Sequence, residues 1–534
     1  MSIERLPEEL LIRVFRALRD APPRTHRWIV VTHVCQSWRQ IALNAAELWT
    51  YIHSGNADIV NAFVLRSKQA PLDIHYVSER TKEGSYAVMG ILMPQTSRIR
   101  SMHLRAPNAA DLFLQYSFPE GAPLLRSLGL HHATFSGGRS AIVITNASDT
   151  DIPDICRQGI PDLRHLHLFA WPKRDVHSLR GLMNTSLRSL IVSWPKSPQP
   201  VNVWVSILTE LPLLEELRLL DALGIMTSTQ EQEMTPSVPL PSLTGLTITD
   251  SRPEETVAML QRLIPAENAS IVVKPNSFFG SPGASVAQLL EVLNEKFTPR
   301  RHSTSFCDPT YLSLRFTENT NRSGYQLTLS GPLFDDDTNK CPGHRLRHTR
   351  LILNLHLRGV RLDKDAVATL LCDMLSKMFS LSSLKVLELD TVYDPHIRDT
   401  GLLVPSACRE LFPQMSNLRV LSIGAVYIDT NLTQSLGNIG SSSPVSFPIL
   451  EALTIRHPPP KQSINFSPLF QTLQLRKDAG YPISRVHVCG GLSKQNEIAE
   501  LRAYLLPLAT SLDCRVDYCI LPDILADRYI EHVP

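Results

Sequence analysis

A short apolar pattern recurs along the chain after residue 90. Each copy has an apolar residue, two residues of any type, a second apolar residue, one residue of any type and a third apolar residue. The alternation that ends each copy predicts a short strand with its apolar side chains on one face. The nine copies are IRSMHL at 99, LRSLGL at 125, LRHLHL at 163, LRSLIV at 187, LEELRL at 214, LTGLTI at 243, LKVLEL at 384, LRVLSI at 418 and LEALTI at 450.

Helical segments such as 365–379 lie between these strands, so the pattern predicts an α/β chain with a strand and a helix in each unit. This resembles a leucine-rich-repeat solenoid. The repeats are irregular, and the turn positions that hold Asn or Cys in that family hold other residues here. Between the sixth and seventh copies, further strands are predicted at SIVV 270, YLSLRF 311, YQLTLS 325 and LILNLHL 351, with a hairpin around Asn321–Gly324.

The first fifty residues have helical rather than alternating periodicity. Pro7 and the acidic residues after it predict a helix start, and Leu10, Leu11, Val14, Phe15 and Leu18 form its apolar stripe. A second helical stretch is predicted over 34–45. A domain of this size barely buries a core of its own, so we expect a partner to cover part of its apolar surface.

The segments LPEELLIRVFRAL, VCQSWRQIA and ELW resemble, in order and spacing, the F-box motif, with a loop length like that of fungal members. The resemblance covers about a tenth of the chain and implies binding to a Skp-type adaptor, which links the chain to a cullin ubiquitin ligase. Part of the matching set is expected to form the small core, and part to contact the adaptor. The matching positions are Leu6, Pro7, Leu10, Leu11, Phe15, Val34, Cys35, Trp38, Leu48 and Trp49.

The predicted fold class is therefore α/β, a small all-α N-terminal F-box followed by an irregular leucine-rich-repeat-like strand and helix solenoid. The expected domains are a helical F-box domain at 1–52, a connecting segment at 53–95 and the repeat-like array at 96–534. The implied function is that of the substrate-recognition subunit of a Skp/cullin/F-box ubiquitin ligase. An adaptor-bound scaffold that does not direct degradation is the alternative.

Composition and charge limit the classes of partner and the cell compartment to be expected. Apolar residues make up 43% and charged residues 19% of the 534, and the formal net charge is +2, so nothing favours nucleic acid or a membrane as partner. Nine scattered cysteines without a paired framework indicate reduced thiols and a cytoplasmic or nuclear location. The acidic residues near the N-terminus do not fit a secretion signal.

The sequence contains none of the common catalytic or cofactor fingerprints, so no enzyme activity, cofactor or metal is expected. Cys514 and Cys519 lack paired histidines, and His165 and His167 lack a third metal ligand.

The outward positions of the strands are the expected target-binding surface, basic and histidine-rich early and acidic late. We expect an acidic segment of the target to meet the early repeats, and binding to tighten modestly in mild acid if the histidines titrate normally. The candidate residues are Arg105, His131, His165, His167, Phe169, Arg218, Glu388 and Asp390.

Overall fold

The computed structural model divides into two compact units, residues 1–251 with 262–266, and residues 252–261 with 267–534. Apart from some isolated positions, the structure describes residues 6–21, 26–77, 82–106, 121–132, 160–171, 182–193, 197–224, 237–266, 269–275, 311–319, 322–330, 349–358, 381–392, 411–424, 445–456, 467–491 and 514–521.

The first unit begins with a helical module. Pro7 precedes the first helix, acidic Glu8 and Glu9 lie in its first turn and Arg19 lies in its last, so the charges match the helix dipole. Cys35 caps the next helix, since its Sγ accepts a hydrogen bond from the Trp38 amide at 3.5 Å. Both predicted helices are confirmed. The elements are α1 (Glu8–Asp20), η2 (His26–His33), α2 (Gln36–Asn44) and η3 (Ala46–Trp49).

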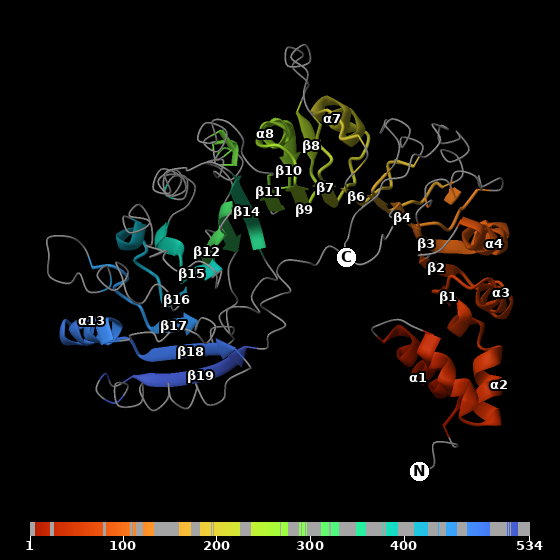
Figure 1. Ribbon diagram of the computed structural model, residues 1–534, viewed down its shortest axis with the longest axis horizontal. Helices are drawn as coiled ribbons and strands as arrows, with labels where there is room; N and C mark the ends of the chain where they lie inside the picture. The colour runs from red at the N-terminus through yellow and green to blue at the C-terminus, as the bar shows by residue number, and fades with distance from the viewer. Residues whose placement is uncertain are drawn as a thin grey trace. The chain divides into compact units, whose positions relative to one another are not determined.

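A row of parallel strands follows, in the order β1-β2-β3-β4-β5-β6-β7-β9. Figure 1 shows α3 and α4 next to each other beside the first of these strands. Two further short strands, β8 (Val238–Leu240) and β10 (Leu263–Pro265), pair with each other. The row and its helices are β1 (Tyr51–Ile52), α3 (Ala57–Arg66), β2 (Leu72–Val77), α4 (Lys82–Leu92), η4 (Met93–Arg98), β3 (Ile99–Ala106), β4 (Ser127–His132), β5 (His165–Phe169), β6 (Ser189–Ser193), α7 (Val201–Thr209), β7 (Glu216–Leu220) and β9 (Gly245–Thr249).

The repeated pattern explains this row. Each copy in the first unit becomes a strand, and the register places like positions side by side, as with Leu104, Leu130 and Leu168. All three leucines are completely buried. Burying a side chain of this size stabilises the fold by about 1.5–3 kcal/mol, so the recurring leucines hold neighbouring strands on one shared core.

The sheet begins earlier than the sequence pattern indicated. The expected connecting segment at 53–95 contains α3, β2 and α4, and β2 pairs in parallel with β3. Its strand LDIHYV alternates apolar and polar residues, but the position that opens the pattern, three residues before Ile74, holds Pro71, so a search for the full pattern passes over it.

The second unit also has a mainly parallel sheet, in the order β11-β14-β13-β12-β15-β16-β17-β18-β19. The predicted hairpin is confirmed, because β12 and β13 are antiparallel and Asn319 faces Arg322. The expected helix at 365–379 lies largely outside the described residues. The elements are α8 (Pro253–Arg262), β11 (Ser270–Lys274), β12 (Tyr311–Asn319), β13 (Arg322–Ser330), β14 (Thr349–Arg358), η9 (Leu381–Ser383), β15 (Val386–Val392), η10 (Phe412–Gln414), β16 (Val420–Gly424), β17 (Ala452–Arg456), α13 (Ser467–Asp478), β18 (Arg485–Gly491) and β19 (Arg515–Leu521).

Candidate functional site

Helix α1 carries two apolar stripes with different environments. Leu11 and Phe15 point into the module and are 3% and 0% exposed. Leu10, Val14 and Leu18 follow each other at four-residue spacing and are 44%, 52% and 47% exposed. Leu6, which precedes the helix, is exposed as well. Residues four apart lie on one side of a helix, so Leu10, Val14 and Leu18 form a continuous exposed row. Together with Leu6 we call this row the α1 stripe (Leu6, Leu10, Val14, Leu18).

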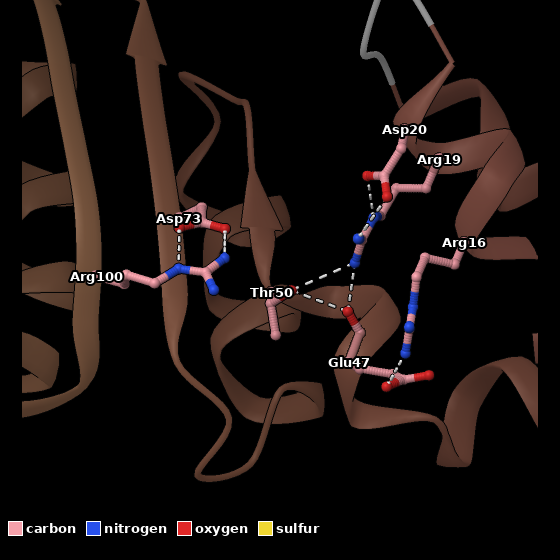
Figure 2. Close-up of polar contacts among 7 residues, drawn as sticks. All are labelled: Arg16, Arg19, Asp20, Glu47, Thr50, Asp73 and Arg100. Atoms are coloured by element: carbon pink, nitrogen blue, oxygen red, sulfur yellow. Dashed lines mark hydrogen bonds and ion pairs between the residues drawn. The ribbon is translucent and has the colours of Figure 1, made fainter. Parts of the chain in front are cut away.

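Polar contacts fix the orientation of α1 in the module (Figure 2). The guanidinium of Arg19 donates to the carbonyl oxygen of Glu47 and, at 3.3 Å, to Thr50 Oγ1. Thr50 Oγ1 itself donates to the same carbonyl at 2.9 Å. One turn back, Arg16 forms an ion pair with the Glu47 carboxylate. These contacts hold the C-terminal turn of α1 on η3.

An aromatic cluster forms a core where η2, η3 and α3 meet. Trp49 is buried, donates from Nε1 to the Ala42 carbonyl oxygen at 2.8 Å, and lies with its ring centroid 5.0 Å from those of Trp28 and Phe63. The guanidinium of Arg66 lies 4.4 Å from the Trp49 ring centroid, within the range of a cation–π contact. Because Phe63 and Arg66 belong to α3, this cluster joins the helical module to the strand row.

The predicted adaptor-binding residues separate into two groups. Leu11, Phe15, Leu48 and Trp49 are buried in the module's own core, so they are the part of the set that forms the core and not the part that is open to a partner. The helix pattern alone cannot distinguish core positions from exposed ones. Trp38 is half-buried, with its ring centroid 5.1 Å from that of Phe15. The exposed members are Leu6, Pro7, Leu10, Val34 and Cys35, and the structure adds Val14, Leu18 and Val30.

Monomeric proteins rarely leave a contiguous row of large aliphatic side chains in water. A small helical module with such a row belongs to the class of protein-binding modules. Residues 3–54 match the family model described as F-box-like. Curated proteins include no match to this chain. The F-box-like match indicates an interaction with a Skp-type adaptor of a cullin ubiquitin ligase.

A second candidate site lies on one face of the strand row in the first unit. His75 on β2 is in register with His103 on β3, and their ring centroids are 6.0 Å apart. His131 on β4 and His167 on β5 lie with ring centroids 4.5 Å apart, and Phe169 stacks on His131 at 5.5 Å. We call His75, His103, His131 and His167 the imidazole face.

A glycine makes room for this arrangement. Gly129 lies between His103 and His167 in the strand register. A β-carbon at Gly129 would come within 2.3 Å of His103 Nδ1, so the imidazole occupies the space that any other side chain would need. On its other nitrogen, His103 Nε2 lies 3.1 Å from Ser127 Oγ. The His103 ring is thus held from two sides.

The imidazole face is neutral near pH 7. Burial lowers the pKa of His75 to about 4, of His131 to about 3 and of His167 to about 4. Burial also lowers the pKa of His103. The neighbouring histidines, with Arg105 beside His75 and His131, add to these shifts. In the free protein, His131 and His167 therefore stay mostly neutral in mild acid, unlike histidines with the ordinary pKa.

Two nitrogen atoms of the imidazole face have no partner in the described parts of the chain. These are His75 Nδ1 and His167 Nε2, which are buried and make no hydrogen bond there. Buried polar atoms are usually paired, so atoms without a partner mark places where a ligand can supply one.

The structure brings most of the predicted target-binding residues together. Arg105 and His165 are exposed on the same face as the imidazole face, while His131, His167, Phe169 and Arg218 are half-buried there. Glu388 is buried, contrary to the prediction, because alternation along one strand does not tell a covered face from a solvated one. Asp390 lies in β15, but its side chain is outside the described residues.

Sequence reasoning missed His53 and His75 because both precede the first copy of the repeated pattern. His53 follows β1, and its ring centroid lies 5.1 Å from that of His75. The signal that could have found them is the short alternation in LDIHYV. Among the described residues, no group of three or more His, Cys, Asp or Glu is placed to hold a metal ion. In the same ranges, no helix is long and apolar enough to cross a membrane.

Proposed function

We propose that this chain is the substrate-recognition subunit of a Skp/cullin/F-box ubiquitin ligase. The helical module binds the Skp-type adaptor, and the strand row, which we propose is a leucine-rich-repeat-like solenoid, binds the target protein. The chain itself catalyses no reaction, because the ligase chemistry belongs to its partners. It acts in the cytoplasm or nucleus, as its reduced cysteines favour.

The observation that carries the adaptor role is the α1 stripe. A helix that packs on one core normally turns polar residues to water on its other side. In α1, Leu10, Val14 and Leu18 are exposed although Leu11 and Phe15 already supply the core contact. Val34, in the loop between η2 and α2, is also exposed. This excess apolar surface is what a partner would remove from water.

The test is capture of a purified Skp-type adaptor by the full chain. Leu10→Glu with Val14→Glu places charges in the proposed contact and should abolish capture. Leu65→Glu is the matched control, since Leu65 is 69% exposed on α3, outside the α1 stripe, and should leave capture unchanged. Wild-type capture by the double variant, with both proteins folded by circular dichroism, would refute the adaptor role.

The role in degradation needs a separate measurement. Proteins bound by the full chain but not by the variant Leu10→Glu with Val14→Glu depend on the adaptor, whereas targets bound by both proteins depend on the strand row. Stabilisation of the second group upon depletion of the chain supports a substrate receptor. If their turnover does not change, the chain is a scaffold.

A further inference from the structure

We propose that the imidazole face binds an acidic segment of a partner protein, with aspartate or glutamate at every second position, and takes up protons as it does so. This deepens the target-binding part of the proposed function and rests on it for the identity of the partner as a target. The inference adds His75 and His103, the unpaired ring nitrogens and the proton linkage.

The spacing of the strands matches such a segment. His75 and His167 lie on β2 and β5, three strand spacings apart, which is about 14 Å at about 4.8 Å for each step. An extended segment places alternate side chains on one side about 6.7 Å apart, so acidic residues at positions i, i+2 and i+4 span about 13 Å. A segment lying across the strands therefore brings one carboxylate to each end of the imidazole face and one to its middle.

The charges around the imidazole face favour an anion. The carboxylate of Asp73 is bound by Arg100, and that of Glu216 by Arg218 and by the Ser189 hydroxyl. Their negative charge is thus largely offset within the chain. The charged and titratable groups next to the imidazole face are His53, Asp73, Arg105, His165, Glu216 and Arg218.

The hydrogen-bonding capacity of the histidine rings also favours an anionic ligand. A neutral imidazole offers one donor, whereas a protonated one donates from both nitrogens. On the imidazole face, His75 Nδ1 and His167 Nε2 are buried and make no hydrogen bond within the described residues. A carboxylate beside either ring would accept from it, and protonation of the ring would supply the donor.

Carboxylates fit better than phosphates. Phosphate sites generally use clusters of forked guanidinium groups. On this face Arg100 and Arg218 are already bound to carboxylates of the chain. The remaining recognition groups are mostly single imidazoles, one on each strand, which suit singly charged side chains spaced along an extended segment.

Proton uptake is expected on binding because the histidine rings of the imidazole face are neutral in the free protein. Because burial keeps the pKa of His75 and His167 at about 4, both rings are mostly neutral at pH 5. A bound carboxylate favours the charged ring and raises its pKa. The bound state then holds more protons than the free state, so affinity rises as pH falls from 7 to 5. Aspartates of the ligand stay ionised in that range, since their ordinary pKa is about 3.9.

The experiment measures fluorescence anisotropy of labelled peptides with the full chain at pH 7, 6 and 5 and constant ionic strength. The probe is Ser-Asp-Ser-Asp-Ser-Asp-Ser, and the matched peptide has asparagine in place of each aspartate. We expect the acidic peptide to bind about tenfold tighter than the amide peptide at pH 5 and to tighten about fivefold from pH 7 to pH 5. The affinity of the amide peptide should not change.

The variant His103→Gln with His167→Gln should lose both the preference for the acidic peptide over the amide peptide and the pH dependence of its affinity. The control His33→Gln, which changes an exposed histidine of η2, should keep both. If the double variant does not fold, histidine ring NMR of the wild-type chain replaces it, and the acidic peptide should raise the pKa of at least one ring of the imidazole face. Equal affinity for the two peptides, or wild-type binding by a folded double variant, would overturn the proposal.

A third peptide, with phosphoserine in place of each aspartate, tests whether the imidazole face prefers carboxylate or phosphate groups. Binding more than tenfold tighter than the aspartate peptide would overturn the choice of carboxylates. Because no adaptor is present in these measurements, loss of the adaptor role would leave their outcome unchanged. If the peptides do not bind a chain that still captures the adaptor, the acidic-segment proposal is wrong and the adaptor role is unaffected.

Discussion

Helix α1 and strand β5 use apolar residues in opposite ways. In β5, Leu166 and Leu168 are buried, and His165 and His167 alternate with them on the other face. In α1, Leu11 and Phe15 fill the core, yet Leu10 and Val14 remain exposed. The two leucines of the strand are both used in its core, whereas the helix has apolar residues in addition to those that its core contact uses. From this comparison we infer that exposed apolar residues, on a helix that already has its core contacts, form a binding surface.

The largest expected effect is on the core side of this comparison. Trp49→Ala removes a buried ring that packs on Trp28 and Phe63 and donates to the Ala42 carbonyl, so the free energy of unfolding should fall by about 3–5 kcal/mol. Leu10→Ala should change it by less than about 1 kcal/mol. Urea unfolding of both variants measures the difference, and similar losses for the two would mean that the α1 stripe belongs to the core.

On the binding side, the order of effects should reverse. Leu10→Ala with Val14→Ala should weaken adaptor binding by about 2–4 kcal/mol, since truncated residues at the centre of an interface often cost about 2 kcal/mol or more. Thermal unfolding should hardly change. Calorimetric titration with the adaptor measures the affinity, and an unchanged affinity would place the contact elsewhere in the module.

The contacts that orient α1 come next. Arg19→Met keeps the apolar stem but removes the hydrogen bonds to the Glu47 carbonyl and Thr50 Oγ1, so the free energy of unfolding should fall by about 1.5–3 kcal/mol. Arg13→Met, at an exposed position of the same helix, is the control. If both variants unfold at the same urea concentration, Arg19 does not hold α1 on η3.

The imidazole face predicts how stability depends on pH. The folded-state pKa of His75, His131 and His167 is lowered to about 4, 3 and 4, so the unfolded chain binds more protons below its ordinary histidine pKa of about 6.5. Stability is present above pH 6.5 and declines as pH falls towards 4. The melting temperature should fall over this window, and less steeply in a variant with all three histidines replaced by glutamine.

The smallest effect is expected at the surface of the strand row. Arg100→Gln removes an exposed ion pair with Asp73, and such pairs contribute less than about 1 kcal/mol. The free energy of unfolding should change by no more than that, and by still less at high salt. A larger loss that persists at high salt would show that this pair has a structural role.

The elements of this fold were largely predictable from periodicity, because parallel strands bury one side of a repeated alternation and amphipathic helices bury one stripe. The nine pattern copies all become strands, and the hairpin at 311–330 is antiparallel as predicted. β1 and β2 were not found, because neither sequence contains the full pattern, and only strand pairing reveals them: β1 pairs with β2, and β2 with β3.

The candidate sites were less predictable, because burial depends on neighbours distant in sequence. Leu10 and Leu11 are adjacent and equally apolar, yet only the packing on η2 and α2 decides that Leu11 is buried. Glu388 alternates with leucines as an outward residue would, yet it is buried. The pKa of His131 is lowered by burial and, to a smaller extent, by His167 and His103 on neighbouring strands. None of these effects is visible in a single segment of sequence.

The most direct test of the central claim is hydroxyl-radical footprinting of the full chain with and without a Skp-type adaptor. The account predicts that adaptor binding lowers the oxidation of Leu6, Leu10, Val14, Leu18, Val30 and Val34, while Leu65 on α3 and Leu213 before β7 stay as reactive as in the free chain. If the α1 stripe stays fully reactive in the saturated complex, or if protection appears only on the strand row, the α1 stripe is not the adaptor-binding surface.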